Sequence, residues 1–294
     1  MSWQRFLLKD GRLHPGWRAF LFLPLYIITQ TATGAAFILA FYLPTRRIPE
    51  IRPPSVFLIG LELVITGALV VLVFVMRRFV DGKSFRSLGF EVGRRLLPDA
   101  GLGLALGFFL MALVFALHVS LGWAAVGQIL PLSQALQVLV LSFFFLLTAA
   151  LNEELAFRGY FLQNLEEAFG TAWAVAVSSI IFSLFHFLNP HFSRLAFINI
   201  ALAGVLFAVA YLLTRNLWLP TVLHFSWNYF QGPVFGFPVS GIAFPSILNL
   251  EIRSGNFILS GGAFGPEGGL SGTIATLLGI AILWLWMGRN APKR

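Results

Sequence analysis

Long runs of apolar residues alternate with short polar or basic stretches along most of the chain. A helix needs about 20 mostly apolar residues to cross the hydrocarbon core of a bilayer. Runs of about this length predict spanning helices near residues 19–43, 56–76, 99–121, 133–152, 171–188, 195–213, 217–231 and 271–287. The seventh run is short and polar, which is typical of a helix that faces the interior of a bundle. We therefore predict an all-α polytopic membrane protein, with about eight transmembrane helices in one bundle and a single membrane domain over residues 1–294.

Composition supports this interpretation and excludes several other classes of protein. Hydrophobic residues make up 58% of the chain and charged residues 11%, whereas soluble globular domains carry about 25% charged residues. The chain has no cysteine, which excludes disulfides, thiolate metal ligands and a cysteine nucleophile. The first 20 residues lack the short apolar core and small-residue cleavage site of a signal peptide, so we expect a basic cytoplasmic lead-in.

The net charge of +8 is distributed between the apolar runs, which indicates membrane orientation rather than nucleic-acid binding. If the N-terminus is cytoplasmic, the cytoplasmic segments hold Arg5, Lys9, Arg12, Arg18, Arg77, Arg78, Lys83, Arg86, Arg94, Arg95, Arg215, Arg289, Lys293 and Arg294. The external segments hold Arg46, Arg47, Arg52, Arg194 and Arg253. Because Lys and Arg are enriched in cytoplasmic loops, we predict that both termini are cytoplasmic.

Two loops differ from the rest in composition. Residues 77–98 form a basic cytoplasmic loop, which is typical of a topology signal and could also bind anionic lipid headgroups. Residues 232–270 form a long external loop rich in Gly and Pro, which predicts either a lid or ordered packing over the bundle. No internal repeat is visible in the sequence, and this disfavours a transporter built from inverted repeats.

Charged side chains within spanning segments are costly and indicate functional sites. The candidate residues, with one amide, are Glu62, His118, Glu153, Glu154, Arg158, His186, His224 and Asn228. Glu62 and His118 lie toward the ends of their helices, from which they can reach the interface, so we predict structural roles for both. The other six fall into three units with helical spacing.

The first unit is NEELAFR, residues 152–158, in which Glu154 and Arg158 are four residues apart. This spacing places both on one helix face, where they can form an ion pair. Glu153 is rotated by about 100° from Glu154, so we predict a free carboxylate that is directed elsewhere. The alternative is a helix that is simply leaving the bilayer, with ordinary interfacial charges.

The second and third units are Phe182 with His186 and His224 with Asn228, and both have the same four-residue spacing. Each pair therefore shares a helix face. A single histidine on an apolar helix is more often a hydrogen-bonded packing residue than a catalytic one. His191 follows a proline and is expected to lie in a loop, so it is not a candidate.

Counting residues predicts that these units meet. Gly170 is expected to mark a turn between antiparallel helices, and Glu153 lies 17 residues before it while His186 lies 16 after it. The two side chains should then have the same depth. His224 follows Arg215 by nine residues, or about 13 Å of helix, so we expect a site that is reached from the cytoplasmic side.

A carboxylate with two imidazoles and a carboxamide is suited to hydrolysis by an activated water. Glu153 could act as general base and His186 could orient the same water. His224 and the Asn228 amide could stabilise an oxyanion. In an alternative, Glu153, His186 and His224 would bind zinc, although the HExxH helix of many zinc proteases is absent. We favour the glutamate-driven reaction, with no cofactor required.

The three motifs in order, EExxxR (Glu153, Glu154, Arg158), FxxxH (Phe182, His186) and HxxxN (His224, Asn228), resemble those of the CPBP family of intramembrane proteases. This family includes the type II CAAX prenyl endopeptidases and their bacterial relatives, also called the Abi family. The motif core covers about residues 133–232, and the GPEGG segment before the last helix is similar to that of bacterial members.

This resemblance implies an eight-helix bundle with a cytoplasm-facing conical cavity. It also implies that Glu153 and His186 activate water, that His224 and Asn228 form the oxyanion hole, and that Glu154 and Arg158 support the site. The partners would be the lipid bilayer and a peptide or lipidated protein substrate. Alternatives are a non-catalytic membrane scaffold, a bacteriocin immunity protein or a proton-coupled transporter. The oligomeric state, the substrate and its prenylation stay open.

Overall fold

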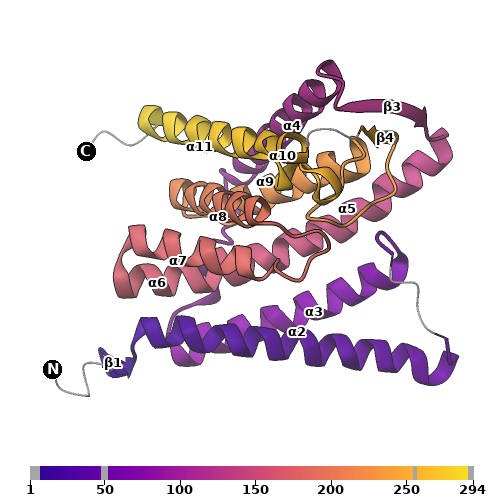
Figure 1. Ribbon diagram of the computed structural model, residues 1–294. Helices are drawn as coiled ribbons and strands as arrows, with labels where there is room; N and C mark the ends of the chain where they lie inside the picture. The colour runs from indigo at the N-terminus through magenta and orange to yellow at the C-terminus, as the bar shows by residue number, and fades with distance from the viewer. Residues whose placement is uncertain (1–6, 48–51, 254–256, 291–294) are drawn as a thin grey trace.

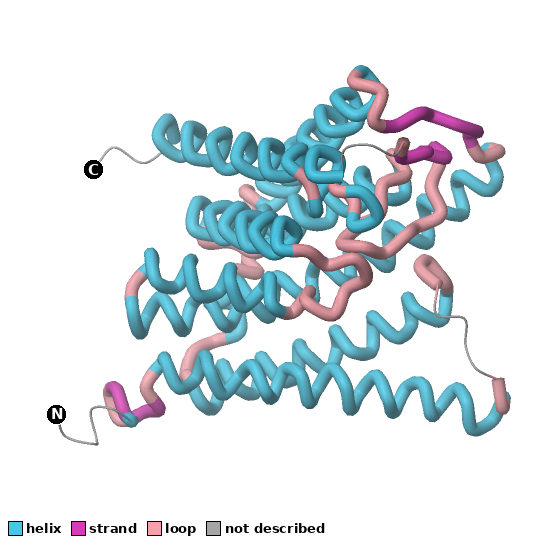
Figure 2. Tube along the Cα trace, in the orientation of Figure 1, coloured by secondary structure: helices cyan, strands magenta, loops and turns pink. Residues whose placement is uncertain are grey.

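Each of the eight predicted apolar runs contains a helix in the computed structural model, which describes residues 7–47, 52–253 and 257–290 and, within them, side chains as far as residue 286. The helices lie side by side, and α3, α4 and α5 are tilted relative to α2 and α11 (Figures 1 and 2). They are α2 (Pro15–Thr45), α3 (Val56–Val75), α4 (Leu96–Ser120), α5 (Leu132–Glu154), α7 (Thr171–Leu184), α8 (Arg194–Thr214), α9 (Trp218–Tyr229) and α11 (Leu270–Asn290).

Among the described residues, five helical stretches are long and apolar enough to cross a bilayer. They are Pro15–Thr45, Val56–Val80, Leu96–Ser120, Leu132–Phe169 and Arg194–Thr214. Thr171–Leu184 and Leu270–Trp286 are apolar but shorter, and α9 has only 12 residues. The protein is therefore a mostly helical integral membrane protein, but the predicted number of eight spans is not confirmed. The prediction that the seventh segment faces the interior is confirmed, because most of α9 is buried.

The polar extension of α5 carries the chain well past the first motif. It consists of the π-helical segment η3 (Leu155–Phe161) and helix α6 (Leu162–Phe169). The extension ends at Gly170, whose φ of 82° is in the left-handed region that favours glycine. Helix α7 then returns alongside α6. The predicted turn at Gly170 is confirmed.

Two glycines of α4 let α9 pack closely against it. A Cβ atom at Gly107 would lie 2.6 Å from the side chain of Ser226, and one at Gly103 would lie 2.8 Å from the backbone nitrogen of Leu223. Ser226 donates a hydrogen bond to the carbonyl of Leu104 (2.8 Å). Helix α9, which carries the third motif, is therefore held against the backbone of α4.

One end of the bundle, here called the basic end, contains the start of α2, the α6–α7 turn and the end of α11 (Figure 1). Its short elements are the hairpin of β1 (Leu8–Lys9) and β2 (Arg12–Leu13), η1 (Met76–Val80) and η2 (Phe85–Leu88). Buried Asp81 accepts hydrogen bonds from Arg77 (3.1 Å) and the Tyr160 hydroxyl (2.8 Å). Arg215 donates two hydrogen bonds to Glu166, which raise the pKa of the Arg215 guanidinium. Arg5, Lys293, Arg294 and the side chain of Arg289 lie outside what the structure describes.

The opposite end, here called the loop end, contains the Gly- and Pro-rich segment. Strands β3 (Ala124–Ile129) and β4 (Leu248–Ile252) pair there as an antiparallel two-stranded sheet that the sequence pattern did not predict. The segment also contains η4 (Phe230–Val234), α10 (Phe257–Ser260), η5 (Gly262–Phe264) and η6 (Pro266–Gly268). Backbone hydrogen bonds such as Gly241 N–H to Phe264 O (2.9 Å) join distant parts of it. We predicted either a lid or ordered packing for residues 232–270. The described residues, 232–253 and 257–270, are ordered and packed, and residues 254–256 lie outside the described chain.

Candidate active site

Glu154 is the anionic centre of the first motif. Its carboxylate is fully buried, and Oε1 accepts hydrogen bonds from Arg158 Nη1 (2.8 Å) and from His224 Nδ1 (2.9 Å). The predicted pairing of Glu154 with Arg158 is confirmed. The contact with His224 was not predicted, because it depends on how α9 packs against α5 and not on local spacing.

Phe182, the aromatic residue of the second motif, packs against the buried guanidinium of Arg158. The Arg158 guanidinium lies 4.4 Å from the centre of the Phe182 ring and donates to the carbonyl of Gly204 (3.1 Å). The Phe182 ring in turn lies 4.9 Å from the imidazole of His186. Phe182 therefore packs between the buried cation and the histidine of its own helix face.

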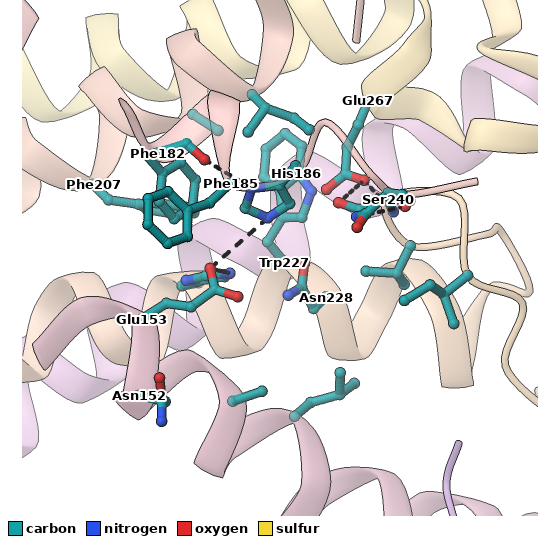
Figure 3. Close-up of a pocket in the computed structure, with 18 of the residues that line it drawn as sticks. Asn152, Glu153, Phe182, Phe185, His186, Phe207, Trp227, Asn228, Ser240 and Glu267 are labelled. Atoms are coloured by element: carbon teal, nitrogen blue, oxygen red, sulfur yellow. Dashed lines mark hydrogen bonds and ion pairs between the residues drawn. The ribbon is translucent and has the colours of Figure 1, made fainter. Parts of the chain in front are cut away.

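His186 stands just beyond the end of α7, with its ring facing Glu153 (Figure 3). Its Nδ1 is 2.9 Å from the carbonyl of Phe182. A carbonyl can only accept, so Nδ1 carries the proton, and the Nε2 of a neutral His186 is left as an acceptor. This Nε2 lies 3.9 Å from Glu153 Oε2.

His224 approaches the same carboxylate oxygen from α9. Its ring stacks on Phe207 with a centroid distance of 4.6 Å, and its Nε2 also lies 3.9 Å from Glu153 Oε2. That oxygen is buried and has no hydrogen-bond partner among the described residues. The predicted convergence of the three units at one depth is confirmed.

These side chains line one cavity of about 460 Å³. Asn228 lines it together with the Glu153 carboxylate and both imidazoles, as predicted. Several further polar residues share the lining and were not predicted to belong to the site: Tyr26, Gln30, Glu62, Asn152, Ser240 and Glu267. Ser240 and Glu267 face the cavity from the loop end, where Glu267 accepts from the Ser240 amide (2.6 Å) and hydroxyl (2.9 Å; Figure 3).

Three other residues singled out in the sequence have different outcomes. Glu62 lines the cavity, and its structural role stays a prediction. His118 is fully buried and its Nδ1–H donates to the Val114 carbonyl (2.8 Å), so it is a packing residue but does not reach the interface. His191 is exposed, in the loop where it was expected.

The zinc alternative would use the same three converging side chains. Within the described part of the chain, no three His, Asp or Glu side chains are grouped as a recognisable metal site. Glu153 Oε2 lies 3.9 Å from the Nε2 atoms of His186 and His224, whereas neighbouring ligand atoms of a tetrahedral zinc lie about 3.4 Å apart. Both the metal-free and the zinc-dependent reaction stay predictions.

The cavity lies on one side of a layer of packed side chains. We expected both termini and the cavity mouth at the cytoplasmic face, and both orientations stay predictions. The lining residues of α5 are Glu153 and residues that precede it toward the loop end, such as Phe145 and Ala149. Residues 155–162, on the side of the basic end, are all buried. Packed side chains therefore close the cavity on the side of the basic end.

Comparison with known proteins gives one match. Residues 134–230 match the family model described as Type II CAAX prenyl endopeptidase Rce1-like. This region contains all three motifs of the site. The searches of curated proteins and of solved structures each gave no match.

Proposed function

Since residues 134–230 make this chain a member of the CPBP family of CAAX-type proteases, we propose that its cavity hydrolyses a peptide bond with a water activated by Glu153 and His186. The general class, an intramembrane endopeptidase, follows from the family. The assignment of individual residues and the absence of a metal from the mechanism belong to the proposal.

The observation that carries the proposal is the position of Glu153 Oε2. It is buried without a hydrogen-bond partner among the described residues, and lies 3.9 Å from both imidazole Nε2 atoms. A separation of 3.9 Å is too long for a direct hydrogen bond but suits a water that bonds to both groups at about 2.8 Å. A water in that position would contact the carboxylate and the acceptor nitrogen of His186.

The proposed reaction balances with Glu153 as the proton carrier. Glu153 takes one proton from the water while the hydroxide oxygen attacks the carbonyl carbon of the substrate. The C–N bond of the tetrahedral intermediate then breaks, and Glu153 returns the proton to the leaving nitrogen. His186 orients the water through its Nε2 lone pair, because its Nδ1–H is held by the Phe182 carbonyl.

Under the proposed mechanism, Asn228 and His224 stabilise the oxyanion, and they differ in the protonation state that this requires. The Asn228 carboxamide always offers N–H donors. His224 directs Nδ1 toward Glu154, so it can donate from Nε2 only as the doubly protonated imidazolium. Asn228→Asp keeps the size and removes the donor, and we expect a loss of about 10²–10³ in kcat.

A cleavage assay tests the proposal directly. The purified protein in liposomes would be incubated with a library of peptides, with and without lipid modification, and the products identified by mass spectrometry. We expect cleavage by the wild type and loss of cleavage in Glu153→Ala and His186→Ala. Full activity in Glu153→Ala would rule out the mechanism. A wild type without any cleavage would instead favour a scaffold or immunity role.

Removal of metal separates the two chemical alternatives. We expect the rate of cleavage to be unchanged after treatment with a chelator, because the proposed reaction uses Glu153 as general base and needs no metal. The assay is repeated after dialysis and after addition of zinc. Loss of activity with chelator that zinc restores would overturn the metal-free mechanism and assign Glu153, His186 and His224 as ligands.

A further inference from the structure

Two buried hydrogen bonds connect α2, α3 and α5 beside the first motif. The Tyr26 hydroxyl donates to Asn152 Oδ1 (3.0 Å), and Asn152 Nδ2 donates to the Thr66 hydroxyl (3.0 Å). All three residues are buried. Because Asn152 directly precedes Glu153, these bonds fix the helix faces that α2 and α3 turn toward the candidate active site.

Gln30 and Glu62 each lie one helical turn from this connection. Gln30 is four residues from Tyr26 on α2 and Glu62 is four residues from Thr66 on α3, so each shares a helix face with a fixed side chain. Both residues line the cavity. Within the described chain, the buried Gln30 Nε2 has no hydrogen-bond partner, and Glu62 forms no hydrogen bond or ion pair. The cavity therefore contains an amide and a carboxylate that are available to a ligand.

The charges along the cavity are not balanced. The described lining residues include Glu62, Glu153 and Glu267 but no Lys or Arg. Glu267 is held by hydrogen bonds within the loop end. The buried guanidinium of Arg158 is paired with Glu154 and is not part of the lining. Since like charges in one cavity repel each other, a positive group there would be attracted by Glu62 and by Glu153.

We propose that Glu62 determines specificity by binding a positively charged side chain of the substrate, a Lys or Arg near the scissile bond. The inference rests on the proposed function, because the cation belongs to the peptide that Glu153 would cleave. The Glu62 carboxylate accepts charge-assisted hydrogen bonds from the ammonium or guanidinium group. The Gln30 amide offers a donor and an acceptor to the peptide backbone. This role is an alternative to the structural one that the sequence predicts for Glu62.

Paired peptides test the proposal. Each pair has Lys in one peptide and norleucine at the same position in the other, and the position is moved residue by residue along an apolar sequence. Cleavage in liposomes gives kcat and KM for the wild type, Glu62→Gln and Glu251→Gln. Glu251→Gln is the matched control, because Glu251 is exposed on β4 and does not line the cavity.

We expect the wild type to prefer the Lys peptide by about 10–100-fold in kcat/KM, mainly through KM, at one or two positions of the Lys. We expect Glu251→Gln to keep this preference and Glu62→Gln to lose it. A wild type that cleaves both members of every pair equally would overturn the proposal. A Lys preference that persists in Glu62→Gln would overturn it too.

A binding assay separates this proposal from the proposed function. Fluorescent versions of the same peptides are titrated into Glu153→Gln protein in detergent, with and without the additional change Glu62→Gln, and anisotropy gives Kd. We expect the Lys peptide to bind about 10–100-fold more tightly than its norleucine partner, but only when Glu62 is present. This result in a protein whose wild type cleaves nothing would support the cation site and reject the protease. Equal binding of both peptides would overturn the cation site, whatever the cleavage assay shows.

Discussion

The two adjacent glutamates of the first motif have different surroundings, so we expect substitutions of the two residues to have different effects. Glu154 is fully buried and binds both Arg158 and His224, whereas the Glu153 side chain is 30% exposed and its Oε2 binds neither imidazole directly. Glu154 thus connects Arg158 of the first motif to His224 of the third motif. Glu153 is left free to act on a water.

Glu154→Gln should lower stability and activity together. The change leaves the buried Arg158 guanidinium without an anion, which typically costs about 3–5 kcal/mol. It also weakens the bond that orients His224. We expect a clear fall in Tm, measured by thermal unfolding in detergent, together with loss of cleavage.

Glu153→Gln is the matched control at the neighbouring position. It keeps the size of the side chain and breaks no hydrogen bond of Oε2 within the described chain. We expect Tm to stay close to that of the wild type, while the rate falls by about 10²–10⁴ through loss of the general base. Equal Tm values for the two variants would contradict the division of roles.

At the residue scale, local spacing predicted which side chains share a helix face but not which helices meet. The four-residue spacing gave the Glu154–Arg158 pair correctly. The hydrogen bond from His224 to Glu154, and the presence of Glu62 in the cavity, depend on contacts between distant segments. No spacing rule contains that information.

At the scale of elements, the apolar runs predicted where all the main helices lie along the chain. They did not predict how long each helix is. Helix α9 has 12 residues because it is packed inside the bundle rather than exposed to lipid along a full span. The β3–β4 sheet was not predicted, since its strands are short and more than a hundred residues separate them. Its stability depends on the assembled loop end.

The glycines of α4 give a prediction at this scale. A Cβ at Gly107 would lie 2.6 Å from Ser226, so Gly107→Ala must push α9 away from α4. Overpacking of this kind costs about 1–3 kcal/mol. Because α9 carries His224 and Asn228, we expect both a lower Tm and a lower kcat.

Gly101→Ala, in the same helix, is the control. An added Cβ there meets nothing within 4 Å, and Gly101 is exposed. We expect Tm to be unchanged or slightly higher, because alanine favours helix more than glycine does. Equal effects of the two substitutions on unfolding and peptide cleavage would show that the contact between α4 and α9 does not position the third motif.

At the scale of the whole molecule, the polar groups that line the cavity lie on one side of a closed layer. A proton-coupled transporter would need a path of such groups through both halves of the bundle. Instead, the cavity ends at the level of Glu153, and residues 155–162 behind it are buried. The sequence predicted that the polar groups meet, but it could not reveal the closed layer, because burial depends on the packing of all neighbouring helices.

Behind that layer, Asp81 joins three parts of the molecule and gives the last prediction. The Asp81 carboxylate has no exposed surface. It accepts hydrogen bonds from Arg77 and from the Tyr160 hydroxyl, and it lies 4.0 Å from Arg18 Nε. Asp81→Asn leaves the buried guanidinium of Arg77 without its anion, whereas Arg18 keeps Glu167 at 3.9 Å. We expect a loss of about 3–5 kcal/mol in the free energy of unfolding. Asp10→Asn is the control, since Asp10 is an exposed residue of the β1–β2 turn at a positive φ that asparagine tolerates. Chemical denaturation in detergent should separate the two variants, and an Asp81→Asn protein as stable as Asp10→Asn would mean that apolar packing alone closes the basic end.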